Sequence, residues 1–332
     1  MPTKMLKLIF CLMLMQPITT SSEQSLFVRS LWLLQQFGNT AATNTKNDVS
    51  LKSVLAKAIA KDSVITFNEV GEFMTSENFQ KIAGKDDLID LEDIARALDS
   101  SIPGNRTKLN AKVRAHAEYL TTTFDMIDEE HREAAERLAN WMASKYESDK
   151  PLDVIVVCTG NSRRSILGSS LGNLAAAYYG LSNVRFHSGG TAPSAFNSRT
   201  ITALNGIGFS IEATGMEATR GDLKTRNPKY RVSWGEDMES IEFSKHYADE
   251  SNPQQGFAAL MVCTEADVGC PNVAGATIRL SMPYLDPKLY DDSSFETAKY
   301  AERRDDIGRT MLSTLCQVRR AIDAKKNETT SP

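Results

Sequence analysis

Apolar and polar positions follow a helical period through the first half of the chain, from residue 23 to about residue 150. Side chains spaced three and four apart form apolar stripes, so we expect this half to be an all-α region. The stripes are Leu51, Val54, Leu55 and Ile59; Leu88, Leu91, Ile94 and Leu98; and Ala134, Leu138, Trp141 and Met142. There is no repeat or metal-ligand spacing, and His116 and His131 are expected on the solvated surface. The pattern indicates no function for this half.

From residue 151 the pattern changes to apolar runs that alternate with helical stripes. Residues 153–157 and 257–262 are short apolar runs, which is typical of strands buried on both faces of a parallel sheet. A further strand is expected over 184–187, a hairpin over 231–243 around Gly235, and helices over 167–178, 201–207 and 307–322. Ser293 to Glu296 matches a capping box in front of the last helix. Because strands and helices alternate, we predict an α/β fold with a doubly wound parallel sheet, preceded by the all-α region.

Residues 1–22 have the layout of a secretory signal peptide. Lys4 and Lys7 form a basic start, an apolar run follows from Leu8 to Met15, and the exit is small and polar. The run is too short to span a bilayer, and the alternative is a buried N-terminal helix. If the peptide is cleaved, we expect a periplasmic or extracellular protein without a transmembrane span, and otherwise a cytoplasmic one. The predicted organisation is a signal peptide (1–22), a helical region (23–150), an α/β domain (151–326) and a disordered tail (327–332).

Charge and cysteine content narrow the classes of function. The chain has 38 Lys and Arg against 42 Asp and Glu, a net charge of −4, and it contains no basic block. A nucleic-acid partner is therefore not expected. The five cysteines are too few for a disulfide scaffold, so each is interpreted by its position.

The candidate chemistry lies where the first strand of the second half meets its helix, between Cys158 and Ser165. In an open parallel sheet, ligands bind beyond the carboxyl ends of the strands, and loop amides at a helix N-terminus attract an oxyanion. The planar guanidinium of Arg164 can donate hydrogen bonds to two oxygens of an oxyanion. The positive field of the loop amides and the helix N-terminus also stabilises the thiolate of Cys158, which makes this cysteine a candidate nucleophile. The expected oxyanion-binding residues are Thr159, Gly160, Asn161, Ser162 and Arg163. The alternative is a buried structural cysteine near a surface arginine.

This loop, Cys-Thr-Gly-Asn-Ser-Arg-Arg-Ser, resembles the signature loop of low-molecular-weight protein tyrosine phosphatases and of the thioredoxin-coupled arsenate reductases that share their fold. The resemblance extends from about residue 152 to residue 322. It includes Ser188-Gly189-Gly190-Thr191, Asn197 with Arg199, and Leu204 to Gly208, in the order expected for the family. The N-terminal half lies outside it.

The resemblance implies a role for each loop residue. Cys158 is the nucleophile, Arg164 clamps the oxyanion, Asn161 holds the loop in shape and Ser165 stabilises the thiolate. Asp286, followed by Pro287, matches the acid loop of the family, where a carboxyl group protonates the leaving oxygen and then accepts a proton from water. The alternative for Asp286 is an ordinary Asp-Pro turn. Asp291 and Asp292 are expected to cap the following helix.

A cysteine pair separates the two branches of the family. Cys263 and Cys270 follow the strand 257–262, and the arsenate reductases carry a pair at this spacing, followed by proline, as a redox relay. The alternatives are a static disulfide or a metal site that lacks ligands. Cys316 is expected to be a packed side chain in the last helix. The sequence departs from the family pattern at two places. Arg163 stands where the reductases often have a cysteine, and the adjacent aromatic pair that tyrosine phosphatases commonly carry is absent after Asp286-Pro287.

Three functions remain open at this point. The first is arsenate reduction through Cys158, Cys263 and Cys270, with an external thiol reductant such as thioredoxin and no bound cofactor or metal. The second is hydrolysis of a phosphorylated substrate through Cys158, Arg164 and Asp286. The third, which the complete loop makes the weakest, is an oxyanion-binding module whose helical half recruits a partner. Arsenate reduction is the favoured prediction.

Overall fold

A computed structural model describes residues 64–71, 74–83, 87–89, 93, 106–121, 123–222, 224–270 and 272–330. The chain divides into two compact units, residues 1–102 and residues 103–332. The predicted signal peptide and the apolar stripe from Leu51 to Ile59 lie outside the described residues. Within the described part, no helix combines the length and the apolar character needed to cross a membrane.

The first unit contains an antiparallel strand pair, so the expectation of an all-α region is wrong there. Strands β1 (Ile65–Thr66) and β2 (Leu88–Ile89) pair, and Leu88 lies opposite Thr66. Helices α4 (Phe67–Val70) and α5 (Ser76–Ala83) follow β1. The side chain of Glu69 accepts a hydrogen bond from the backbone of Thr66 at 2.8 Å, which starts α4. The apolar spacing that starts at Leu88 predicts a helix, but a short apolar pattern is compatible with either a helix or a strand.

The second unit is an α/β domain built on a four-stranded parallel sheet, as the alternating pattern predicts. The strands are β3 (Leu152–Cys158), β4 (Val184–Gly190), β8 (Phe257–Met261) and β9 (Ala276–Ser281). Their order across the sheet is β4-β3-β8-β9, and every neighbouring pair is parallel. All four carboxyl ends therefore meet at one edge of the sheet.

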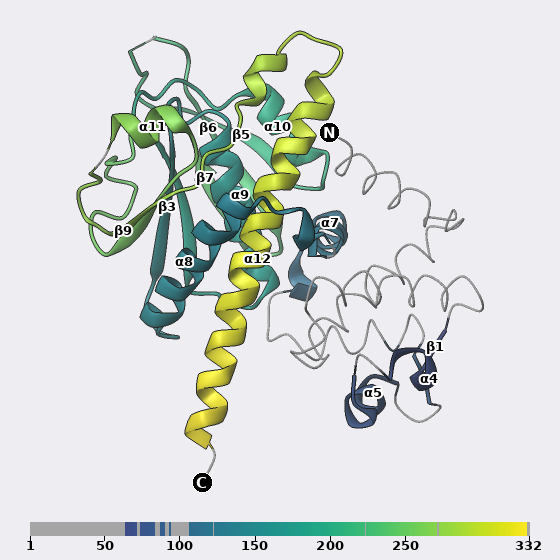
Figure 1. Cartoon of the computed structure of the whole chain (residues 1–332). Helices are drawn as coiled ribbons and strands as arrows, with labels where there is room; N and C mark the ends of the chain where they lie inside the picture. The colour runs from purple at the N-terminus through teal and green to yellow at the C-terminus, as the bar shows by residue number, and fades with distance from the viewer. Residues whose placement is uncertain are drawn as a thin grey trace, which may run out of the picture. The chain divides into compact units, whose positions relative to one another are not determined.

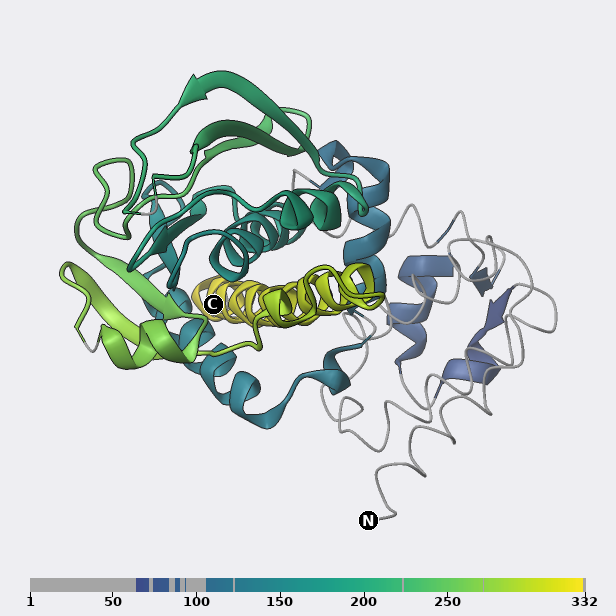
Figure 2. The same cartoon turned by 90° about the horizontal axis from the view of Figure 1, so that it is seen from above.

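Three helices form a layer against one face of this sheet (Figure 1). They are α9 (Arg164–Tyr178), α12 (Glu296–Thr330) and α8 (Glu129–Lys145), and α12 lies between the other two (Figure 2). A Cβ atom on Gly172 would lie 2.4 Å from the ring of Phe186, so the glycine lets α9 approach β4 closely. The layer buries the predicted stripe of the last helix: Ile307, Met311, Leu315, Val318 and Ile322.

A loop, rather than a helix, lies against the other face at the end of β4. Gly189 points away from α9, because Phe186 points toward it and side chains alternate along a strand. A Cβ atom on Gly189 would lie 2.5 Å from the Cα atom of Tyr247, and Asn252 donates a hydrogen bond to the carbonyl of Ser188 at 3.1 Å. A doubly wound sheet has helices on both faces, so the structure differs from the prediction at the end of β4, where a loop covers the second face.

A three-stranded antiparallel sheet contains the predicted hairpin. Strands β6 (Pro228–Gly235) and β7 (Met238–Glu242) pair on either side of the turn after Gly235, and β5 (Ser210–Glu217) pairs with the free edge of β6. Helix α10 (Ser198–Asn205) precedes β5. Strand β5 was not predicted from the sequence, because its side chains are largely exposed and show no apolar alternation.

The helices α7 (Ala111–Thr121) and α8 pack on α12, inside the same compact unit as the sheet. This unit begins at residue 103, whereas the apolar pattern indicated a boundary near residue 150. Helix α12 continues to Thr330, into the segment 327–332 that was expected to be a disordered tail. The short helices of the unit are η2 (Arg106–Lys108), η3 (Phe124–Met126), α11 (Thr264–Gly269) and η4 (Pro287–Tyr290).

Candidate functional site

The candidate site is assembled from the carboxyl ends of the four parallel strands. Cys158 ends β3, Gly190 ends β4, Cys263 follows β8, and Asp286 lies in the segment after β9. Because β3 and β8 pair with Val157 opposite Met261, the two cysteines come from adjacent strand ends. The topology thus brings together residues that are far apart in the sequence.

Asn161 and Ser165 organise the loop around the Cys158 thiol. The Sγ atom of Cys158 lies 3.1 Å from the hydroxyl of Ser165, and the side chain of Asn161 donates to the same hydroxyl at 2.9 Å. The Oδ1 atom of Asn161 accepts a hydrogen bond from the backbone of Lys245 at 2.8 Å. The backbone of Asn161 has φ 40°, a left-handed conformation that asparagine tolerates better than most residues. Asn161 therefore ties the loop to both neighbouring segments.

The segments that follow β4 and β7 close the back of the loop. The carbonyl of Gly160 accepts hydrogen bonds from the backbone of Ser194 at 3.0 Å and from the hydroxyl of Ser244 at 2.9 Å. A Cβ atom on Gly190 would lie 2.6 Å from the carbonyl oxygen of Thr159, so only glycine fits at the end of β4. Lys245 and Ser244 were missed by sequence reasoning, because nothing local to a loop residue indicates which distant backbone it will meet.

The structure brings Arg164 and Asp286 together. The Nη2 atom of Arg164 donates to a carboxylate oxygen of Asp286 at 2.7 Å, and its Nη1 atom donates to the carbonyl of Tyr284 at 2.9 Å. The Arg164 side chain is 8% exposed and that of Asp286 29%, so the pair lies at the mouth of the site. One nitrogen of the guanidinium thus donates to a carboxylate oxygen, and an oxyanion oxygen could accept a hydrogen bond of the same kind.

Helix α8 supports the segment that carries Asp286. His131 forms a hydrogen bond of 2.8 Å with the carbonyl of Pro283, and its ring lies 4.2 Å from that of Tyr284, centroid to centroid. His116 of α7 forms an ion pair of 2.8 Å with Asp305 when it is protonated. Both histidines were expected to be solvated surface residues, and both instead hold α7 or α8 against the α/β domain.

Arg163 is engaged by a polar cluster at the start of α12. Its Nε atom donates to the hydroxyl of Tyr300 at 2.7 Å and its Nη2 atom to Asp291 at 3.1 Å. Tyr300 in turn donates to Asp291 at 2.7 Å, and burial together with this hydrogen bond raises the pKa of Tyr300 to about 12. Asp292 pairs with Arg199 at 2.6 Å. The expectation that Asp291 and Asp292 cap the last helix is therefore wrong, because arginine and tyrosine side chains occupy their oxygens.

Cys263 lies against the wall of the loop. Its Sγ atom is 3.4 Å from the hydroxyl of Thr159 and accepts a hydrogen bond from the backbone of Ala266, also at 3.4 Å. Burial raises the pKa of the Cys263 thiol, Cys158 adds to this rise, and Thr159, the Ala266 backbone and Arg164 oppose it. Because Cys158 and Arg164 both influence this pKa, the sulfur of Cys263 lies within electrostatic reach of the loop.

Cys270 lies at the other end of the six-residue helix α11. Its Sγ atom lies 3.3 Å from the carbonyl of Asn272 and 3.5 Å from the hydroxyl of Tyr247, and its single S–H can donate to either. The contact with Cys270, together with burial, raises the pKa of Tyr247. Cys158, Cys263, Cys270 and Cys316 are all free and buried, so the alternative of a static disulfide between Cys263 and Cys270 is not what the structure contains.

Two further observations concern the residues of the site and the comparisons with known proteins. The described residues include no cluster of three or more His, Cys, Asp or Glu side chains arranged to hold a metal ion. Compared with known proteins, the chain matches no family model and no curated protein. The arrangement offers a thiol beside a hydroxyl, a guanidinium paired with a carboxylate, and a second thiol in contact with the loop.

Proposed function

We propose that this protein is a cysteine-thiolate enzyme for oxyanions with the low-molecular-weight phosphatase fold, and that it reduces arsenate to arsenite. The observation that carries the proposal is the position of Cys263, whose sulfur lies 3.4 Å from the Thr159 hydroxyl in the loop that begins at Cys158. A second thiol in this place has no use in phosphoester hydrolysis, but a reduction needs it to supply the second electron.

In the proposed reaction, the thiolate of Cys158 attacks arsenic, an arsenate oxygen leaves as water after taking up protons, and a sulfur–arsenic adduct forms. The thiolate of Cys263 then attacks the sulfur of Cys158. The sulfur–arsenic bond breaks with its electron pair on arsenic, which leaves as arsenite, and a Cys158–Cys263 disulfide remains. Cys270 attacks Cys263 and restores the Cys158 thiolate, and an external dithiol such as a thioredoxin reduces the Cys263–Cys270 disulfide.

The alternative function is hydrolysis of phosphomonoesters, and the contact of 2.7 Å between Arg164 and Asp286 favours it. Here Cys158 attacks phosphorus, Arg164 holds the equatorial oxygens, and Asp286 protonates the leaving oxygen before accepting a proton from water. No electrons move, so Cys263 and Cys270 are dispensable.

Counting products and thiols in one purified, reduced sample separates the two functions. Without an external donor, the reductase makes about one arsenite per chain and stops, and mass mapping then finds Cys263 bonded to Cys270. Cys270→Ser should complete that turnover and accumulate the Cys158–Cys263 bond, whereas Cys263→Ser should release no arsenite. Cys158→Ser should abolish either activity, because an alcohol is not ionised near neutral pH. Cys316→Ser, in α12, is the matched control and should behave as wild type.

The opposite result is equally clear. If reduced wild-type protein makes no arsenite but hydrolyses aryl phosphate through many turnovers, and Cys263→Ser leaves that hydrolysis intact, the reductase proposal is wrong and the phosphatase remains. Turnover by Cys158→Ser in either assay would contradict both.

A further inference from the structure

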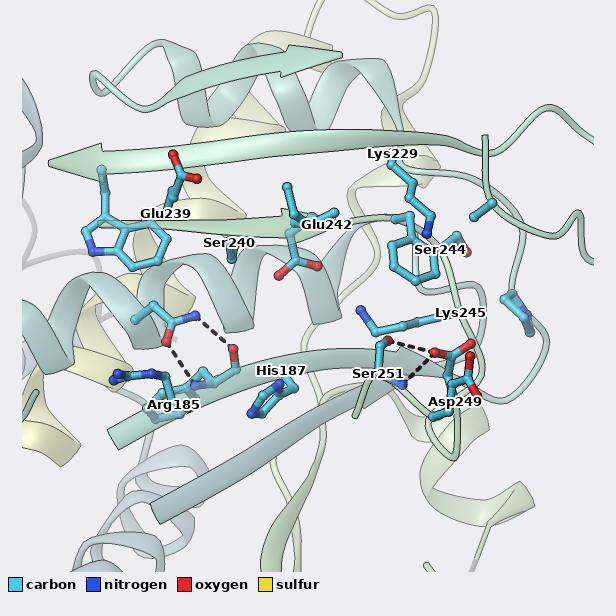
Figure 3. A pocket seen from close by; sticks show the side chains of 18 of the residues that line it. Arg185, His187, Lys229, Glu239, Ser240, Glu242, Ser244, Lys245, Asp249 and Ser251 are labelled. Carbon is cyan, nitrogen blue, oxygen red and sulfur yellow. Dashed lines mark hydrogen bonds between the residues drawn. The ribbon is translucent and has the colours of Figure 1, made fainter. Parts of the chain in front are cut away.

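Different parts of the fold hold the two ends of the loop in the candidate site. Its first half is held by Lys245, which lines the cavity shown in Figure 3 and donates to Asn161 through its backbone at 2.8 Å. Arg164, at the other end, is bonded instead to the segment that follows β9. The position of this segment therefore determines how Arg164 is presented.

Tyr284 connects three parts of the site. Its backbone N–H donates to the carbonyl of Val262, the residue before Cys263, at 3.1 Å. Its own carbonyl accepts from the Nη1 atom of Arg164 at 2.9 Å, and it lies two residues before Asp286. A displacement of Tyr284 would therefore reach both reacting segments and the guanidinium between them.

The carbonyl of Tyr284 also fixes the orientation of the Arg164 guanidinium. With Nη1 occupied, the edge that remains is formed by Nη2, which donates to Asp286 at 2.7 Å, and by Nε. The Nε atom is buried and has no hydrogen-bond partner among the described residues. Because the guanidinium is a rigid plane, a partner on one nitrogen sets the direction of the opposite edge. That edge carries the two donors that a bidentate oxyanion requires.

His131 of α8 holds the same segment through two contacts. Its Nε2 atom lies 2.8 Å from the carbonyl of Pro283, which can only accept, so the ring donates a proton from Nε2. Its ring centre lies 4.2 Å from that of Tyr284. The side chain of His131 is 12% exposed and Tyr284 is 3% exposed, so both contacts are largely shielded from water. In such surroundings a hydrogen bond restrains its partners more strongly than on the surface.

We propose that His131 is a positioning residue of the candidate site, which fixes Tyr284 so that its carbonyl orients Arg164 toward an oxyanion. The inference rests on the proposed function in either form, because both reactions need the oxyanion to be held by Arg164. It also assigns a function to α8, which precedes the part of the chain that resembles the phosphatases. His131 itself touches no reacting atom and acts only through Tyr284.

Equilibrium binding of inorganic phosphate to the full chain, measured by calorimetry, tests this without turnover. His131→Gln and His131→Asn carry the same amide, but only glutamine is long enough to reach the carbonyl of Pro283. Glutamine should bind phosphate nearly as well as the wild type, and asparagine about 3–10-fold more weakly, the effect of one hydrogen bond. His131→Phe keeps a ring against Tyr284 without a donor and should be as weak as asparagine, which provides a second variant if asparagine impairs folding.

Two further variants show whether the effect passes through Arg164. His116→Asn is the matched control, because it removes the ion pair between α7 and Asp305 of α12 and should leave phosphate affinity unchanged. Arg164→Met should abolish the binding, which places the phosphate at this site. In an Arg164→Lys background the difference between the glutamine and asparagine variants should fall below twofold, because the donors of an ammonium rotate freely and need no carbonyl to orient them.

Three results would contradict the inference. Equal phosphate affinities of the glutamine and asparagine variants, or an undiminished difference in the Arg164→Lys background, would overturn it, and arsenite production by the wild type would then still support the proposed function. If the wild type binds no phosphate, the oxyanion site is wrong, and the proposed function fails together with the inference.

Discussion

Asn161 combines a left-handed backbone with two side-chain hydrogen bonds at the centre of the candidate site. Its φ of 40° would suit glycine, but glycine could bond neither to the Ser165 hydroxyl nor to the Lys245 backbone. The hydrogen bonds of Asn161 hold Ser165 beside Cys158, and they offset the cost of its strained backbone conformation.

Replacing Asn161 with alanine and with glycine separates these two effects. Both variants lose the hydrogen bonds, which should lower the free energy of unfolding by about 1–3 kcal/mol. Alanine should be less stable than glycine by about 1 kcal/mol, because only glycine adopts a positive φ without a steric penalty. Urea denaturation measures both. Asn205, at the end of α10 and exposed, is the control: there glycine should be the less stable replacement, since the backbone is helical.

At Cys263 the protonation state should set the rate of arsenite release. Burial raises the pKa of this thiol, so near neutral pH it is largely protonated, and only the thiolate attacks sulfur. In the Cys270→Ser variant, single-turnover release should rise steadily with pH between pH 7.5 and 9, because the thiolate fraction of Cys263 grows over this range. Phosphate affinity measured over the same range is the control. A release rate that does not change with pH would show that Cys263 is not the limiting nucleophile.

The element that decides whether the two relay cysteines can meet is α11. Cys263 is its N-cap and Cys270 its C-cap, so a rise of about 1.5 Å per residue places their Cα atoms roughly 10 Å apart. A disulfide needs Cα atoms within about 7 Å, and α11 must therefore unwind before the bond can form. Asp267 restrains it, because Arg279 of β9 donates to its side chain and to its carbonyl, each at 2.6 Å, and Ser281 donates at 2.7 Å.

Asp267→Asn should weaken this restraint and speed formation of the Cys263–Cys270 disulfide by about 3–10-fold, the effect of losing roughly 1 kcal/mol from a charge-assisted contact. Oxidation of the reduced chain by diamide, followed by mass mapping over time, measures the rate. Asp323→Asn removes a comparable ion pair with Arg319 within α12 and should not change it. Equal rates in the wild type and in Asp267→Asn would mean that unwinding of α11 is not limiting.

At the scale of the whole molecule, α7 and α8 complete the α/β domain. Four of their larger apolar side chains are fully buried: Val113, Leu120, Leu138 and Met142. Their burial contributes about 6–12 kcal/mol at 1.5–3 kcal/mol each, which equals the net stability of a typical domain. His131 adds a direct contact with the segment that leads to Asp286.

A fragment of residues 103–332 should therefore unfold cooperatively, whereas a fragment of residues 149–332 should be insoluble or lack a cooperative transition. Differential scanning calorimetry of the two fragments measures this. If the shorter fragment unfolds cooperatively with a similar Tm, α7 and α8 are dispensable and the boundary near residue 150 is the physical one.

Features that depend on near neighbours along the chain could be predicted from the amino-acid pattern. The apolar run before Cys158, the loop and the stripe after Arg164 predict a strand, a turn and a helix, because side-chain periodicity and capping act over a few residues. The same local signals predicted β8, the hairpin and the last helix. They also placed Cys158, Asn161, Arg164 and Ser165 on one loop before any tertiary contact was known.

Contacts between distant segments could not be predicted in this way and are known from the fold. It pairs Arg164 with Asp286, puts Thr159 against Cys263, and supports Asn161 with Lys245, all across more than 80 residues. In the structure α8 packs on the α/β domain, although the apolar stripe of α8 is equally compatible with a separate helical region. A local pattern shows that one face of an element will be buried, whereas the partner that buries it is selected by the packing of the whole unit.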